Sequence, residues 1–175
     1  MRRGRGRPSH HLNRALGAKE ESRMSEPLFR NTHNQDQEML KAYAQASNTI
    51  NDFIDLVKSG PEAIYAAKLR FRDPDLSEKL GEDRFLYIWL SNVYFHVEEN
   101  FLSGVFFEVP EELTKWHQIG ERLGFDPEDV FDWMVIENGH AKGAYTMRVT
   151  RAQLDSEKEK QEYDSYVGIS SYEPI

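Results

Sequence analysis

Two runs of β-branched, aromatic and long apolar residues flank the dipeptide Asn138-Gly139. The first run occupies 130–137, and the second continues to residue 149 through Gly143-Ala144-Tyr145. Asn-Gly tolerates the positive φ angles that a tight hairpin turn requires. The stretch therefore predicts two antiparallel strands joined at residues 138 and 139, and it makes antiparallel sheet part of the fold.

A helical pattern precedes this sheet, between Gln35 and Lys58. Its apolar positions are spaced four and three residues apart, at Met39, Tyr43, Ala46, Ile50, Phe53 and Val57. This spacing predicts one amphipathic helix, which Asn34 or Asp36 can cap and Ser59-Gly60-Pro61 ends. An apolar stripe on a single helix must be covered. The sheet is the obvious partner, and a second copy of the chain, giving a homodimer, is the alternative.

Four further segments have the composition and period of strands, at 65–72, 85–97, 101–109 and 123–125. The first half of 85–97 is apolar on both faces, which predicts a place at the sheet centre. Residues 73–83 are expected to form a charged loop, and 111–120 either a short helix or an irregular crossing. Residues 151–163 predict a charged helix.

These elements predict an α+β fold in one domain, residues 35–163. We expect an N-terminal amphipathic helix packed on a twisted, mainly antiparallel sheet of about five strands, with a partly closed barrel as the alternative. Residues 1–34 are expected to be a disordered basic tail, and 164–175 a loosely ordered C-terminal tail. Lys19-Glu20 can be encoded by a purine run like a ribosome-binding site ahead of Met24, so we hypothesise that residues 1–23 are not translated in the native protein.

Charge and composition exclude several classes of function. Residues 1–23 carry seven basic and two acidic residues, which leaves 15 basic and 28 acidic residues from Met24 onward. An acidic surface repels phosphate backbones, so the folded domain is not expected to bind nucleic acid. The absence of cysteine excludes disulfides, thiolate nucleophiles and Cys-based zinc sites. No apolar run is long enough to span a bilayer and no apolar leader is visible, so we expect a cytoplasmic protein without membrane contact.

The block Asp132-Trp133-Met134, followed by Asn138-Gly139 and then Gly143-Ala144-Tyr145-Thr146-Met147-Arg148, resembles a signature of the YegJ-like bacterial domains of unknown function. The resemblance would extend from about Met39 to Tyr163. Ala144 stands where family members tend to have glycine. The resemblance implies the fold described above, and it implies no catalytic residue or cofactor.

His96 and Glu98 are the weak candidates for metal ligands. Residues two apart on a strand project from the same face, and this pair could chelate a divalent ion with His117, His140 or Asp132 as a third ligand. The alternative, which we favour, is a half-exposed histidine at a strand end and a glutamate in a solvated turn. We expect no metal or other cofactor.

Asp132, Arg148 and Tyr145 are the weak candidates for catalysis. Asp132 beside Trp133 could be a buried base with a raised pKa, and Arg148 is expected to pair with it across the hairpin. The structural interpretation, in which Asp132 accepts backbone hydrogen bonds, is favoured. No Gly-x-Ser-x-Gly motif or phosphate-binding glycine loop is present, and Ser91 and Ser103 lie within predicted strands.

A protein-binding function suits the remaining features. Trp116 and His117 lie in the 111–120 insertion beside Glu111 and Glu112, where exposed aromatic residues tend to contact a partner. The leading hypothesis is a non-catalytic protein-binding or regulatory module, immunity-like in using an acidic surface against a basic partner. The alternative is a small metal-dependent or carboxylate-based hydrolase built on Asp132, Arg148, His96 and Glu98.

Overall fold

The computed structural model describes residues 29–175, with side chains from Asp36 onward. The predictions for residues 1–28, including the disordered tail and the start at Met24, lie outside the described part of the chain. From Phe29 the chain is helical.

One open, twisted sheet organises the described residues, with the strand order β4-β3-β2-β1-β5-β6-β7. Its strands are β1 (Ile64–Arg72), β2 (Phe85–His96), β3 (Phe101–Phe106), β4 (Arg122–Phe125), β5 (Val130–Glu137), β6 (His140–Gly143) and β7 (Ser171–Tyr172). Neighbouring strands are antiparallel except β6 and β7, which are parallel. The α+β prediction is confirmed. The described sheet has seven strands rather than five and does not close into a barrel, because β4 and β7 are its two edges.

The predicted N-terminal helix is two helices, α2 (Phe29–Asn48) and α3 (Ile50–Ser59). Thr49 separates them with φ −110° and ψ 11°. Its hydroxyl donates to the Gln45 carbonyl oxygen at 2.7 Å and accepts from the Trp133 indole Nε1 at 3.1 Å. A bond to a sheet residue therefore fixes the break, and the helical period on both sides gives no sign of it.

The second arm of the hairpin is shorter than predicted. The turn at Asn138 and Gly139 is present, with φ of 49° and 80°, but β6 ends at Gly143. Gly143 and Ala144 both have positive φ, at 71° and 54°, and they turn the chain away from the sheet. Helix α5 (Tyr145–Ala152) follows, so the predicted strand over 143–149 is wrong.

Three other predictions differ from the structure. The charged loop 73–83 contains helix α4 (Pro74–Leu80), which Asp73 caps by accepting the Leu76 amide at 3.0 Å. The helix predicted for 151–163 starts and ends later, as α6 (Glu157–Val167), because α5 occupies the start of the predicted range. The expected loose tail from Asp164 contains the end of α6 and strand β7, which pairs with β6.

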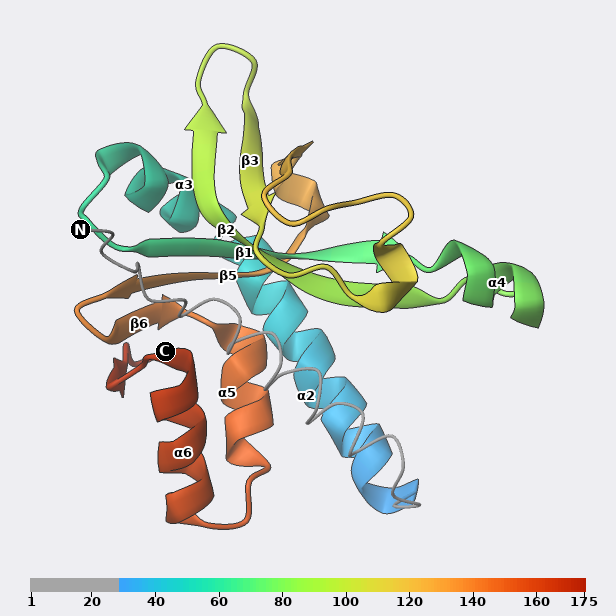
Figure 1. The fold of residues 1–175 in the computed structure, drawn as a ribbon. Coiled ribbons are helices and arrows are strands. Elements are labelled where there is room, and N and C mark those ends of the chain that lie inside the picture. Colours follow the sequence, from blue (N-terminus) through green and yellow to red (C-terminus); the bar gives the residue numbers. More distant parts are fainter. Residues whose placement is uncertain (1–28) are drawn as a thin grey trace, which may run out of the picture.

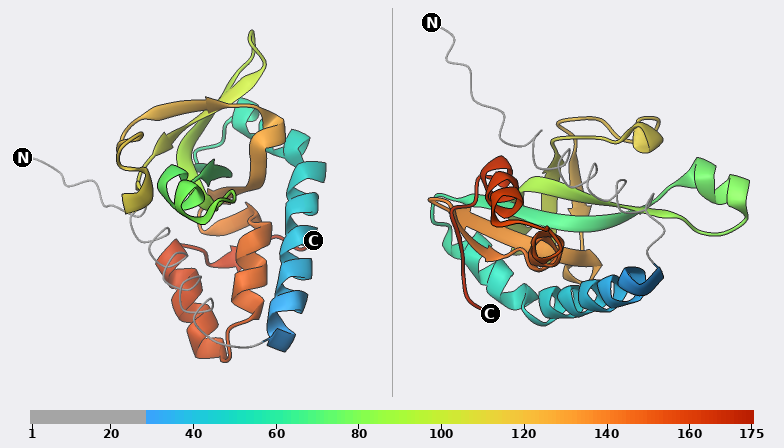
Figure 2. Two further views of the ribbon diagram at one scale, coloured as in Figure 1. Left: turned by 90° about the vertical axis from the view of Figure 1, so that its right-hand side faces the viewer. Right: turned by 90° about the horizontal axis from the view of Figure 1, so that it is seen from below.

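Helices cover both faces of the sheet (Figure 1). On one face, α3 buries Phe53 against Trp133, with ring centroids 5.2 Å apart. On the other, α5 and α6 bury Met147 and Tyr163 with Trp89. Helix α2 runs alongside α5 and contacts β5. Figure 2 shows that the ends of β1 and β2, with α4 between them, project beyond these layers. We call residues 72–84 the arm.

The crossing (residues 107–121) connects β3 to β4. It has a single 3-10 turn, Glu111–Leu113, followed by irregular turns. The segment 111–120 therefore combines the two predicted alternatives, a short helical turn at its start and an irregular crossing after it. The Lys115 ammonium joins the crossing to the arm through the Asp75 carboxylate, 2.7 Å away.

Candidate functional site

Asp132 anchors the first turn of α5 to strand β5. Its side chain is 0% exposed, and its Oδ1 accepts the Trp133 amide at 2.8 Å and the Tyr145 amide at 3.1 Å. Its Oδ2 accepts the amide and the hydroxyl of Thr146, at 2.8 and 2.5 Å. A carboxylate that binds the free amides at a helix N-terminus also interacts favourably with the helix dipole. All of these contacts hold the backbone in place.

Burial is the main electrostatic influence on Asp132. Desolvation raises the pKa of the carboxyl, while hydrogen bonds from Thr146 and the positive charge of Lys68 oppose this increase. Lys68 is itself buried, and its Cα lies opposite that of Asp132 in the β1–β5 register. Its ammonium lies 5.6 Å from the centre of the Tyr87 ring. Asp132, Lys68 and Thr146 are all buried, and the hydrogen bonds of the carboxylate join β5 to the start of α5, which favours the structural interpretation of Asp132.

The side chains of Arg148 and Tyr145 bond to groups other than the Asp132 carboxylate. The Arg148 Nε donates to the Gly143 carbonyl oxygen at 2.9 Å, and its guanidinium lies over the Tyr172 ring. Burial lowers the pKa of Arg148. The Tyr145 hydroxyl lies 3.0 Å from the Thr49 hydroxyl. Arg148 is on helix α5 rather than on the predicted strand, and within the described residues it makes no ion pair with Asp132, although the Asp132 charge raises its pKa slightly against the effect of burial.

His96 and Glu98 do not form a metal-binding pair. Strand β2 ends at His96, and Glu98 lies exposed in the turn that follows. The other proposed ligands have separate partners: His117 contacts Glu121, and His140 contacts Ser171. Within residues 36–175, no three His, Cys, Asp or Glu side chains converge in a group suited to a metal ion.

His96 instead forms part of a polar cluster that the sequence did not reveal. Its Nε2 lies 2.8 Å from the Ser103 hydroxyl, and the Arg122 Nη1 donates to the same hydroxyl at 2.9 Å. These three residues come from three adjacent strands, β2, β3 and β4. They line a pocket of about 470 Å³ together with Tyr65, Asn92, Val93 and Tyr94. The polar residues Ser91 and Asn92, within an otherwise apolar strand pattern, coincide with the bulge located there.

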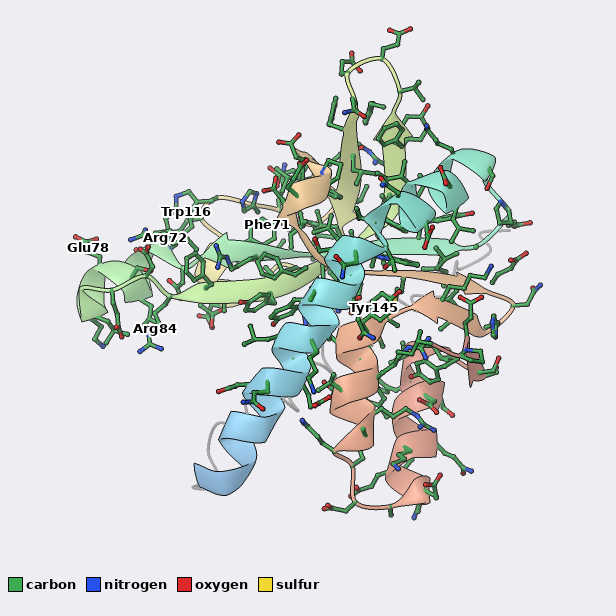
Figure 3. All side chains as sticks on the ribbon, turned by 180° about the vertical axis from the view of Figure 1, so that it is seen from behind. Phe71, Arg72, Glu78, Arg84, Trp116 and Tyr145 are labelled. Atoms are coloured by element: carbon green, nitrogen blue, oxygen red, sulfur yellow. The ribbon has the colours of Figure 1, made fainter. Side chains whose placement is uncertain are left out.

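Trp116 is exposed on the crossing, beside the arm. Its side chain is 46% exposed, and the Lys115 ammonium lies 5.7 Å from the centre of its ring. Figure 3 places Trp116 at the same end of the molecule as Glu78 of α4. We call the exposed apolar and acidic side chains of the arm and the crossing the arm surface: Leu76, Glu78, Leu80, Glu111, Glu112, Trp116 and Ile119.

His117, the neighbour of Trp116, points the other way. Its ring stacks on Phe106, with centroids 4.7 Å apart, and meets the edge of Phe71. Its Nδ1 lies 2.6 Å from a carboxylate oxygen of Glu121. Of the predicted binding residues, Trp116, Glu111 and Glu112 are exposed on the crossing, whereas the His117 ring packs against the core.

Comparison with known proteins gives one family and one relative. The family model described as an uncharacterized protein conserved in bacteria (DUF2314) matches residues 36–171. A protein of Neisseria meningitidis serogroup B, provisionally named an ankyrin repeat protein, is 33% identical over 96 residues. The match covers 54% of this chain and 36% of that protein. No solved structure matches the chain, and no helix in its described part has the length and apolar character needed to cross a membrane.

Proposed function

We propose that this chain, which belongs to the bacterial DUF2314 family, is a protein-binding module that recognises a basic partner through the arm surface. The observation that carries the proposal is the set of large apolar side chains exposed on the arm and the crossing. Leu80 is 48% exposed and Ile119 is 61% exposed. Apolar side chains gathered on one surface and rimmed by charge are typical of protein interaction sites.

The charge around these residues favours a basic partner. The arm has five acidic and three basic residues, and the crossing has four acidic and one basic. Three of the four basic side chains already pair with carboxylates, in Arg72–Asp83, Arg84–Glu82 and Lys115–Asp75. The exposed carboxylates of Glu78, Glu111 and Glu112 remain available at the surface. Complementary charge of this kind accelerates association and selects partners.

The Neisseria relative is compatible with this function. Ankyrin repeats stack into solenoids whose concave surfaces bind other proteins. The segment similar to this chain makes up 36% of that relative. A domain of this kind within a longer protein that is named for ankyrin repeats suits a role in recognition. We infer a regulatory role for the present chain, in which it neutralises or controls its basic partner.

Affinity capture from lysate of the native bacterium tests the proposal. The full chain is used as bait beside three variants: Trp116→Ala, the double variant Glu111→Lys/Glu112→Lys, and the control Val97→Ser. Val97 is an exposed apolar residue in the β2–β3 turn, away from the arm. We expect a stoichiometric, salt-sensitive basic protein that the wild type and Val97→Ser retain and the two arm-surface variants lose. Equal capture by all four baits, or no stoichiometric protein, contradicts the proposal.

A further inference from the structure

A pocket opens where strands β1 and β2 separate. The two strands pair only between Ala67–Arg72 and Phe85–Leu90. Beyond Leu90, β2 continues with β3 alone, and its register shifts between Ser91 and Tyr94. Asn92 in this bulge has a φ of 50°. Bulges redirect side chains and are frequent beside functional sites. Here the bulge lies in the wall of the pocket that His96, Ser103 and Arg122 also line.

Arg122 brings a positive charge to this pocket, and none of the carboxylates from Asp36 onward forms an ion pair with it. Its Nη1 donates to two neutral acceptors, the Ser103 hydroxyl at 2.9 Å and the Asn92 carbonyl oxygen at 3.1 Å. No acidic residue lines the pocket. The preceding residue, Glu121, directs its carboxylate to His117. By contrast, Arg72, Arg84 and Arg151 pair with carboxylates, and Arg70 and Arg148 lie over aromatic rings. In an acidic chain, an arginine held among neutral groups is a site of local positive potential.

His96 and Ser103 add hydrogen-bonding groups beside the guanidinium. The His96 ring stacks on Phe101, with centroids 4.3 Å apart, and meets the edge of Tyr94 at 4.9 Å. These contacts hold its Nε2 toward the Ser103 hydroxyl. Ser103 lies on β3 next to the Val105–Arg122 pair, so the sheet itself sets the spacing of the cluster. The arrangement is built before any ligand arrives, which reduces the entropy lost on binding.

We propose that this pocket binds a small oxyanion group, the phosphate or carboxylate of a metabolite-sized ligand. Arg122 is the charge partner, because a guanidinium presents several N–H donors in a plane that matches these groups. Only its Nη1 donates within the described residues. The Ser103 hydroxyl and the His96 ring complete the polar wall. Val93 and Tyr65 form the apolar wall of the pocket, which would contact the rest of the ligand.

Titration of the isotope-labelled full chain tests this site by nuclear magnetic resonance. Inorganic phosphate and acetate are added separately, with ionic strength held constant by chloride, so that general screening does not contribute. The His96→Gln spectrum identifies the His96 ring signals. We expect saturable shifts at the His96 ring and the Arg122 Nε–H group. Saturation by phosphate alone identifies a phosphate site, and saturation by acetate alone identifies a carboxylate site.

Two variants decide the role of the charge. Arg122→Gln should weaken binding at least about tenfold, as expected for loss of a charge-assisted hydrogen bond. Arg72→Gln, which removes an exposed arginine elsewhere on the sheet, should bind as the wild type does. The amide spectrum of each variant checks that it is folded. Shifts that rise without saturation, or equal affinity in Arg122→Gln and wild type, overturn the proposal.

Discussion

At the scale of single residues, Asp132 and Gly143 determine how the hairpin ends. Asp132 binds the first amides of α5, and Gly143 lets the chain turn toward that helix at a positive φ. Tyr, Thr and Val around α5 are residues that favour strands, and local preference alone predicts a strand there. The helix forms because the Asp132 carboxylate of β5 lies at its N-terminus. Asp132 and Tyr145, which make this contact, are 13 residues apart in the sequence.

Replacing Asp132 with asparagine should destabilise the fold by about 3 kcal/mol, because an amide NH₂ would meet the backbone amides that the carboxylate accepts. Urea unfolding measured by circular dichroism gives the change. Asp55→Asn, at an exposed position on α3, is the matched control and should change stability by less than about 0.5 kcal/mol. Equal midpoints for the two variants would show that Asp132 is not an anchor.

Gly143→Ala should destabilise the protein by about 2 kcal/mol or more, since an added Cβ would collide with the Trp133 carbonyl oxygen and ring. Gly81→Ala is the control, because its φ of 69° is nearly the same as that of Gly143 and nothing lies near its Cβ position. It should show the cost of the backbone conformation alone, about 1 kcal/mol. Thermal unfolding of both variants separates collision from strain, and equal losses would argue against the collision.

At the scale of elements, strands were predicted better than helices. Alternation and the Asn-Gly turn were sufficient for β1, β2, β5 and the position of the hairpin. The break at Thr49 and the two-residue β7 depend on distant partners. Helix α4 has local signals instead, since Asp73 caps it, Pro74 begins it and Gly81 ends it, but its charged composition favoured a loop. Contacts between distant segments also limit how much of the candidate site could be predicted. Trp116 could be recognised from its position in an insertion, whereas Ser103 and Arg122 meet His96 only through the register of three strands.

Strand β7 is held by the side chain of Tyr172, whose hydroxyl donates to the Asp164 carboxylate at 2.9 Å. Tyr172→Phe should lower stability by about 1.5 kcal/mol at neutral pH through loss of this bond. Chemical unfolding with Tyr94→Phe, at an exposed tyrosine, as the control measures the difference. A loss no greater than that of the control would contradict this account of β7.

The same tyrosine predicts a dependence on alkaline pH. Burial, and then the Asp164 carboxylate, raise the pKa of Tyr172 above its usual value of 10.0. The folded state therefore keeps a proton that the unfolded chain releases, so this stabilisation is present below about pH 10 and is lost as the pH rises further. Between about pH 9 and about pH 11, wild type should lose more stability than Tyr172→Phe does. Parallel curves for the two proteins would contradict the shift.

At the scale of the whole molecule, the apolar stripe of α2 and α3 is covered by the chain itself. Ala42, Ala46 and Phe53 are buried within one copy, and among the described side chains of α2 the large apolar residue that is exposed is Leu40. A coiled-coil dimer through this stripe would require it to be free. We expect a monomer of 20.4 kDa by light scattering coupled to size-exclusion chromatography. A species of twice this mass that persists on dilution would show that another surface joins two copies.

The three tryptophans of the chain occupy two different environments. Trp89 and Trp133 are buried on opposite faces of the sheet, and Trp116 stands on the arm surface. Indole emission moves to shorter wavelength as water is removed from the ring. The protein therefore carries an intrinsic optical label: quenching by acrylamide should act first on Trp116, and a ligand that covers the arm surface should protect that emission while leaving the two buried signals unchanged.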